Sequence, residues 1–357
     1  MMSFAVLPSV DINIFLLIFI GLGAGILSGF AGVGGAFVVT PALIILGLPG
    51  NLAVGSSLAW VAGNSIVAVL RHRKLGNVDT KLGLMLAVAA ISGMEVGVRI
   101  LNWATNMGLA DEVVLSISIF MLITVGTYTL LECSRRKRQL DKMLEKEERL
   151  PPAMSATSLP QKLQAINISP MLHFAKSGVT MSLWIMSAVG FFVGTLAGVI
   201  GVGGGFIMVP SLVYLIGISS FIAVGTDLFQ IIFSASYGSI RHAMSGNVLI
   251  LVALIMLVAS SVGVQFGVWT TRYVRGVSVR YVLGILTIIF AIGTMLKLAD
   301  VLLREPTVSL EVSSIAITFG GIGIVLILIC ALFLLGFRYT HGRYIPTWSK
   351  SFVAKEH

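Results

Sequence analysis

Two glycine-rich segments are the part of this sequence best suited to bind a small anion. GVGG at 32–35 and GVGGG at 201–205 lie between apolar runs. Glycine inside a helix costs about 0.8–1 kcal/mol per position relative to alanine, so both segments are predicted to interrupt their helices. The backbone N–H groups freed by such a break, with the start of the next helix, favour an anion. A purely structural hairpin is the alternative. The candidate donors are Gly32, Gly34, Gly35, Gly201, Gly203, Gly204 and Gly205.

Polar side chains follow each glycine segment within apolar runs. Hydroxyl and amide groups can donate hydrogen bonds to an anion, although Ser and Thr in membrane helices also bond their own carbonyls. A carboxylate at the centre of a membrane helix costs about 2.5–3.5 kcal/mol, so Asp227 is either an ion or proton site or a helix cap near the interface. The substrate-binding candidates are Ser56, Ser57, Asn64, Thr226, Asp227 and Gln230.

Charged residues form a third set of candidates. Two Arg-His pairs end apolar runs and could draw anions toward the site from each side, or could only snorkel to the interface. Histidine titrates near pH 6.5, which would make such gates pH-sensitive. Glu95 and Arg99 are four residues apart and can pair on one helix; a structural pair is favoured over a proton carrier. The gating or coupling candidates are Arg71, His72, Glu95, Arg241 and His242.

Composition determines the class of protein that must position these residues. The 357 residues are 57% hydrophobic and 11% charged, with a mean hydropathy of +0.99, whereas soluble domains carry about 25% charged residues. An all-α, polytopic membrane protein is predicted, with roughly 9–11 membrane-crossing elements at about 20 apolar residues per span. The net charge of +9 falls mostly at the ends of apolar runs and in one central segment, which indicates membrane orientation and no nucleic-acid partner.

The chain contains two copies of one unit. At an offset of 169 residues, GLGAGILSGFAGVGGAFVVTP (21–41) recurs as GFFVGTLAGVIGVGGGFIMVP (190–210). After a shift of one residue, the AVG segment at 53–55, Arg71-His72 and GNV at 76–78 recur in the same register. Chance similarity between apolar segments does not keep glycines, a proline and an Arg-His pair aligned. Glycines spaced by four in both copies are interpreted as helix-packing stripes.

The apolar runs predict the boundaries of the units. Each short run after a glycine segment has about 12 residues, or roughly 18 Å of helix, too short for the roughly 30 Å hydrocarbon core. Each copy is therefore predicted to contain a broken or re-entrant hairpin. The predicted units are a first repeat (12–131), a cytoplasmic linker (132–180), a second repeat (181–303), an additional helix (311–337) and a cytoplasmic tail (338–357).

The basic residues predict that the two repeats are inverted. The loop at 71–81 is basic and its counterpart at 241–247 holds one arginine, whereas the loop at 104–111 has no Lys or Arg and its counterpart at 271–280 has three. By the positive-inside rule, the basic side changes between the copies. We expect a multi-pass plasma-membrane protein with its N-terminus outside and its C-terminus cytoplasmic. Inverted repeats are typical of secondary transporters.

The duplicated G-x-G-G…P motif, the AVG[ST] segment and the RH…GNV segment resemble the TauE/SafE sulfite exporter family, whose members are anion permeases for sulfite and organosulfonates. The resemblance covers nearly the full length apart from the linker and tail. It implies a secondary transporter that exports sulfite, sulfoacetate or another organosulfonate, with its site at the two glycine segments and the adjacent Ser56, Ser57, Thr226 and Asp227. The anion would be held between the two broken hairpins, and the repeats would rock about it.

Other functions remain open at this stage. An importer or a channel for another small anion is the alternative, and a membrane-embedded enzyme or a non-transporting scaffold is less favoured because the five histidines form no H-x-x-x-H pattern. The glycine segments lack the strand of a dinucleotide fold, and no Gly-Lys-Ser/Thr occurs. We expect no enzyme activity and no cofactor or metal. The expected partners are a small anion, the lipid bilayer and a coupling proton or ion, with a homo-oligomer left open.

Overall fold

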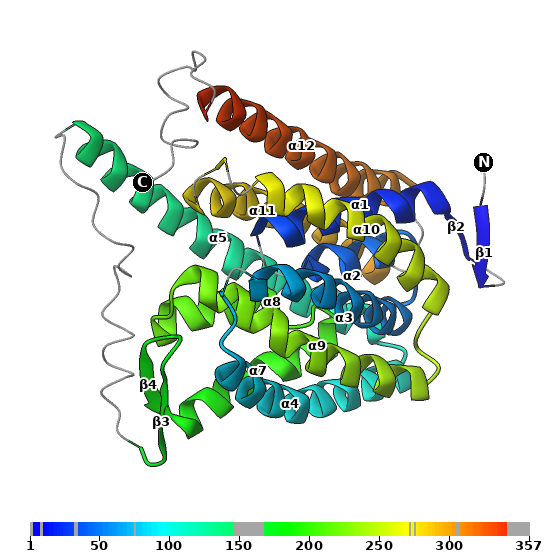
Figure 1. Ribbon diagram of the computed structural model, residues 1–357. Coiled ribbons are helices and arrows are strands. Elements are labelled where there is room, and N and C mark those ends of the chain that lie inside the picture. The colour runs from blue at the N-terminus through cyan, green and yellow to red at the C-terminus, as the bar shows by residue number, and fades with distance from the viewer. Residues whose placement is uncertain are drawn as a thin grey trace.

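The computed structural model describes residues 3–7, 10–31, 35–74, 76–145, 168–270, 273–274, 276–303 and 308–340. Helices dominate these residues, and two short antiparallel hairpins accompany them (Figure 1). The first half contains β1 (Ser3–Leu7), β2 (Val10–Asn13), α1 (Ile14–Ala31), α2 (Ala36–Ile45), α3 (Gly50–Lys74), α4 (Thr80–Asn106) and α5 (Ala110–Glu145). The second half contains β3 (Met171–Phe174), β4 (Val179–Ser182), α7 (Leu183–Ile200), α8 (Gly205–Ser211), the π-helix η1 (Leu212–Ile216), α9 (Ser220–Met244), α10 (Ile250–Thr270), α11 (Gly276–Leu303) and α12 (Val308–Thr340).

Many of these helices can cross a membrane. Seven of the described helices are long and apolar enough, and α1 contains a shorter apolar helix at Ile14–Phe30. The predicted all-α, multi-pass fold is therefore confirmed. The seven candidate spans are Gly50–Lys74, Thr80–Asn106, Ala110–Arg135, Leu183–Ile200, Ile250–Thr270, Tyr281–Leu303 and Ser309–Tyr339.

The two repeats pack against each other element by element. Helix α1 packs on α10 and its counterpart α7 packs on α4, while α3 packs on α9 and α5 on α11 (Figure 1). Each of these contacts joins one copy to the other in a reciprocal way. The main buried apolar cluster accordingly draws residues from both halves. A site at the centre is therefore shared between the copies.

Glycine stripes make the α1–α10 and α4–α7 contacts close. A Cβ added at Gly25 would lie 2.6 Å from the Ser260 Cα, and one added at Gly194 would lie 2.7 Å from the Ala90 Cα. These distances leave no room for a side chain, so the helix backbones meet directly. The packing interpretation of the stripes is confirmed. The stripe residues that contact the opposite copy are Gly21, Gly25, Gly29, Gly190, Gly194 and Gly198.

Two elements occupy part of the segment between the repeats. Helix α5 continues past residue 131 to Glu145, because no proline or glycine interrupts the charged sequence until Pro151. The strands β3 and β4 then form a hairpin at 171–182, where only linker was expected. The residues directly before α7 therefore form a β-hairpin.

Candidate functional site

The helix breaks occur at glycines whose backbone is left-handed. In the first repeat, Gly35 has φ 70° and directly precedes α2. In the second repeat, Gly201, Gly203 and Gly204 have φ of 73°, 69° and 92° and separate α7 from α8. Side chains other than glycine rarely adopt this region. The predicted break is thus present in the second repeat, whereas Gly32 and Gly34 lie outside the described residues.

The second break contains buried backbone N–H groups that have no hydrogen-bond acceptor among the described residues. Gly201 N–H donates to the Ala197 carbonyl at 2.9 Å, which ends α7. The N–H groups of Val202, Gly203 and Gly204 donate no hydrogen bond to any described residue, although these residues are buried. Unpaired buried N–H groups are rare and costly in native proteins. Three such N–H groups in one short segment can donate hydrogen bonds to a bound anion.

A buried polar pair lies beside the second break. A Cβ placed on Gly204 would lie 3.8 Å from Gln230 Nε2, and this Nε2 donates to Asp227 Oδ1 at 3.1 Å. Both side chains come from α9 and are almost fully buried. Asp227 Oδ2 and Gln230 Oε1 have no hydrogen-bond partner among the described residues. The pair therefore has two unpaired acceptor oxygens near Gly204, which can receive a hydrogen bond from a donor or contact a cation.

The first break has a different lining. The position equivalent to Gln230 is Trp60, whose Cη2 would lie 3.3 Å from a Cβ on Gly35. The Trp60 indole N–H donates to Ser260 Oγ at 3.0 Å. Ser57, which stands where the second repeat has Asp227, is buried with an unpaired Oγ. The indole ring of Trp60 thus occupies the position at which the second repeat has the polar carboxamide of Gln230.

Two equivalent phenylalanines join the short helices. Phe37 begins the first turns of α2 and Phe206 those of α8, and their rings stack with centroids 4.6 Å apart. Both are buried. Neither phenylalanine was among the predicted site residues, although their recurrence at the repeat offset was the available signal. The stack therefore joins α2 to α8, the two short helices that follow the breaks.

Ser56 and Thr226 each bond the backbone of the other repeat. Ser56 Oγ accepts a hydrogen bond from Leu249 N–H at 2.9 Å, and Thr226 Oγ1 accepts one from Asp79 N–H at 3.0 Å. Gly55 and the equivalent Gly225 allow this approach, because a Cβ at either would meet the backbone of the GNV segment of the opposite copy. These bonds hold the starts of α4 and α10, so the two hydroxyls have a structural task besides any contact with substrate.

Asn64 lies in the same buried core. Its Nδ2 donates to Ser28 Oγ at 2.9 Å, which links α3 to α1. Its Oδ1 has no hydrogen-bond partner among the described residues. Ser57 Oγ and Asn64 Oδ1 therefore remain available for a hydrogen bond to a ligand. The structure places them on α3, whereas Asp227 and Gln230 stand on α9.

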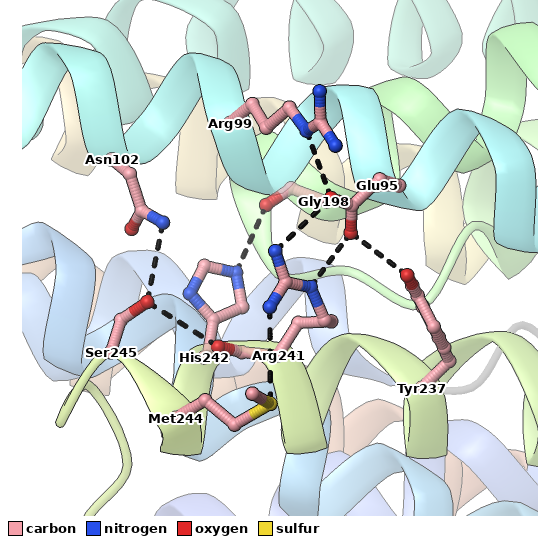
Figure 2. Close-up of polar contacts among 9 residues, drawn as sticks. All are labelled: Glu95, Arg99, Asn102, Gly198, Tyr237, Arg241, His242, Met244 and Ser245. Carbon is pink, nitrogen blue, oxygen red and sulfur yellow. Dashed lines mark hydrogen bonds and ion pairs between the residues drawn. The ribbon is translucent and has the colours of Figure 1, made fainter.

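Glu95 is the centre of a charged cluster on α4 and α9 (Figure 2). Its carboxylate pairs with Arg99 at 2.8 Å, as the spacing predicted. It also receives Arg241 through Nε at 2.7 Å and Nη2 at 3.0 Å, and Tyr237 Oη donates to it at 2.8 Å. The partnership with Arg241 was missed because the residues are 146 positions apart in the chain. The cluster joins the first repeat to the second.

The remaining gating candidates differ in exposure. His242 is buried, and its Nε2 lies 3.3 Å from the Gly198 carbonyl oxygen on α7 (Figure 2). Its counterpart His72 is only half-buried, and Arg71 is exposed. Within the described residues, no three His, Cys, Asp or Glu side chains gather in a group that could hold a metal ion.

Comparison with known proteins identifies relatives of the chain. The profile of the family described as Sulfite exporter TauE/SafE matches residues 17–294. The Probable membrane transporter protein YunE of Bacillus subtilis (strain 168) is 25% identical over 282 residues, which are 77% of this chain and 94% of that protein. The Probable membrane transporter protein YjnA of the same strain is 24% identical over 251 residues, 70% of this chain and 87% of that protein. No solved structure matches the chain.

Proposed function

Because the chain belongs to the TauE/SafE sulfite exporter family and is a multi-pass membrane transporter, we propose that it is a secondary transporter that exports a small sulfur-containing anion. Sulfite, sulfoacetate and other organosulfonates are the proposed substrates. The transported group is an oxyanion with several acceptor oxygens. Several backbone and side-chain donors around it can bind these oxygens better than one positively charged side chain can.

The observation that carries this proposal is the buried second break. Among the described residues, the N–H groups of Val202, Gly203 and Gly204 have no hydrogen-bond partner, and the Gln230 side-chain amide, whose Nε2 would lie 3.8 Å from a Cβ on Gly204, adds a donor group. An anion that accepts from these N–H groups would remove the cost of leaving them buried and unpaired. The proposed substrate contacts are Gly32, Gly34, Gly35, Ser56, Ser57, Asn64, Gly201, Gly203, Gly204, Gly205, Thr226, Asp227 and Gln230.

Asp227 is the proposed coupling residue. Among the described residues it forms no ion pair, and its single hydrogen bond comes from a neutral amide. A lone carboxylate in a dry interior requires a proton or a cation to neutralise it. Transport of an anion past Asp227 is therefore proposed to be coupled to uptake and release of that proton or cation.

The two repeats are proposed to rock about the bound anion. Arg71 and His72 would serve the cytoplasmic entrance, and Glu95, Arg241 and His242 the opposite one. In this arrangement the N-terminus is outside, the C-terminus is cytoplasmic and the protein resides in the plasma membrane. Breaking and remaking the Glu95–Arg241 ion pair would then accompany each cycle.

Flux measurements in proteoliposomes test the proposal. Vesicles loaded with radiolabelled sulfite, sulfoacetate or another organosulfonate should lose label faster than protein-free vesicles, and a pH or sodium gradient should drive the flux. Flux only toward the cytoplasmic side would indicate an importer, and flux that never saturates would indicate a channel. Absence of flux for all three anions would contradict the proposal.

A further inference from the structure

An open surface groove of about 550 Å³ lies between α3 and α10. One wall is the last turn of α3, and the other is one side of α10. Its lining combines a cation and an amide with apolar side chains. The lining residues are Arg71, Val262, Gln265, Phe266, Val268 and Trp269.

The duplication shows what an arginine in this position binds. Arg71 is equivalent to Arg241, and Gln265 is equivalent to Glu95. In the α4–α9 groove, the Arg241 guanidinium holds the two oxygens of the Glu95 carboxylate through Nε and Nη2, at 2.7 and 3.0 Å (Figure 2). Glu95 is thus an internal anion bound in the two-pronged geometry that guanidinium groups favour.

The α3–α10 groove lacks that internal anion. Gln265 is uncharged, and among the described residues Arg71 forms no ion pair. Trp269 stands where the other groove has Arg99. The groove on α10 is consequently open and holds one cation without a counterion.

The walls of the open groove are apolar and reach the outer surface of the protein. Val262 is 66% exposed and Trp269 43%. Helix α10 is a candidate membrane span, so these side chains face the acyl chains of the bilayer. Trp269 also packs on Phe333 of α12, with ring centroids 4.6 Å apart. Tryptophan near the end of a span is typical of the headgroup region.

The surroundings add further positive charge at the same end of α3. Arg71, His72, Arg73 and Lys74 form its last turn. Clusters of basic residues beside membrane helices on the cytoplasmic side attract anionic lipid headgroups. An occupant of this groove therefore needs an anionic head with at least two free oxygens and an alkyl chain.

We propose that the α3–α10 groove binds one anionic phospholipid, whose phosphate pairs with Arg71 while an acyl chain lies along Val262, Phe266 and Trp269. The leaflet depends on the proposed orientation, which makes it the inner one. The site itself does not depend on the substrate of transport. The α4–α9 groove is closed to lipid by its own Glu95 carboxylate.

Lipid retention in nanodiscs tests this site. The full chain is reconstituted in phosphatidylcholine with or without phosphatidylglycerol, and the lipids retained per chain are counted by native mass spectrometry. The natural sequence should retain one phosphatidylglycerol per chain. Gln265→Glu, which copies the Glu95 arrangement, and Arg71→Gln should each weaken retention by roughly tenfold, the loss expected for a charge-assisted hydrogen-bonded pair.

Arg73→Gln is the matched control, because it removes a cation from the same helix turn without touching the cavity lining. It should change retention less than about twofold. Retention equal to that of the natural sequence in both Gln265→Glu and Arg71→Gln would overturn the proposal, as would an equal loss in Arg73→Gln. Thermal unfolding of each variant verifies that it is folded.

A soluble ligand separates the lipid from the transported anion. Hexanesulfonate is titrated into phosphatidylcholine nanodiscs that lack anionic lipid. Binding of hexanesulfonate that is lost in Arg71→Gln and is tighter than binding of phosphatidylglycerol would make the groove a substrate vestibule and overturn the lipid assignment. Because retention is measured without transport, a failed flux assay would leave this result unchanged.

Discussion

The two helix breaks are equivalent in sequence but differ in what lines them. At the first break, Trp60 fills the space beside Gly35 and bonds Ser260. At the second, Gln230 and Asp227 leave oxygen atoms unpaired next to Gly204. A left-handed glycine precedes the short helix in both copies, at Gly35 and Gly204, whereas the carboxylate and carboxamide of Asp227 and Gln230 occur in the second copy alone. The duplicated helices are therefore alike in the two copies, while the side chains beside the breaks differ.

Interactions that hold the repeats together are preserved in both copies. The glycine stripes pack reciprocally, Phe37 stacks on its equivalent Phe206, and Ser56 and Thr226 make matching bonds to the opposite backbone. Three polar or charged positions differ between the copies: Ser57 is replaced by Asp227, Trp60 by Gln230 and Glu95 by Gln265. This contrast suggests where variants should affect transport and where they should affect stability.

Asp227→Asn should have the largest effect on transport. The carboxamide keeps the shape of the side chain but cannot exchange a proton, so gradient-driven flux should fall by about tenfold or more. Ser57→Ala, at the equivalent position of the first repeat, should change flux much less. Radiolabelled anion flux under a pH gradient measures both, and equal losses would contradict the assigned asymmetry.

Gly204→Ala should impair both folding and flux. The φ of 92° is unfavourable for alanine by about 1–2 kcal/mol, and the new Cβ would lie 2.9 Å from Val193 Cγ1. Gly320→Ala in α12 is the control, because its Cβ would meet nothing within 4 Å. We expect a lower midpoint of thermal unfolding in detergent for the first variant alone. Equal midpoints would show that the break tolerates a side chain.

Ser56→Ala and Thr226→Ala should destabilise the protein by similar amounts. Each removes one acceptor for a backbone N–H group of the other repeat, in a hydrogen bond that is buried at Asp79 and partly buried at Leu249, at a cost of about 1 kcal/mol. Ser92→Ala is a suitable control, because the Ser92 hydroxyl only bonds the Val88 carbonyl of its own helix. Thermal unfolding compares the three variants. A loss confined to one of the first two would contradict their equivalence.

The Glu95–Arg241 pair should contribute less to stability than the positions above. Both side chains are partly exposed, at 22% and 29%, so a coupling of about 0.2–1 kcal/mol is expected. A double-mutant cycle of Glu95→Gln and Arg241→Gln measures it. The same cycle with Arg99→Gln should give a weaker coupling, because Arg99 is 74% exposed. The reverse order would place the main partner of Glu95 on its own helix.

Structural features that depend on a single stretch of chain were predicted well from the sequence. Hydropathy identified the membrane class, and the recurring glycines identified both the repeat and the interruption at 201–204. Spacing predicted the Glu95–Arg99 pair. The extent of α5 was underestimated, because hydropathy falls where the helix continues to Glu145. The β3–β4 hairpin was missed because its strands have only four residues each.

The sequence by itself determined the class of the protein, its duplication, its helix breaks and its family resemblance, since all of these are recorded in local composition and in recurring register. Only the tertiary structure decided which partners those residues have. It joined Glu95 to Arg241, stacked Phe37 on Phe206 and directed Ser56 and Thr226 to the opposite backbone. The reason is that each contact depends on how two helices distant in the chain cross, and the hydropathy and spacing of either helix do not specify that crossing.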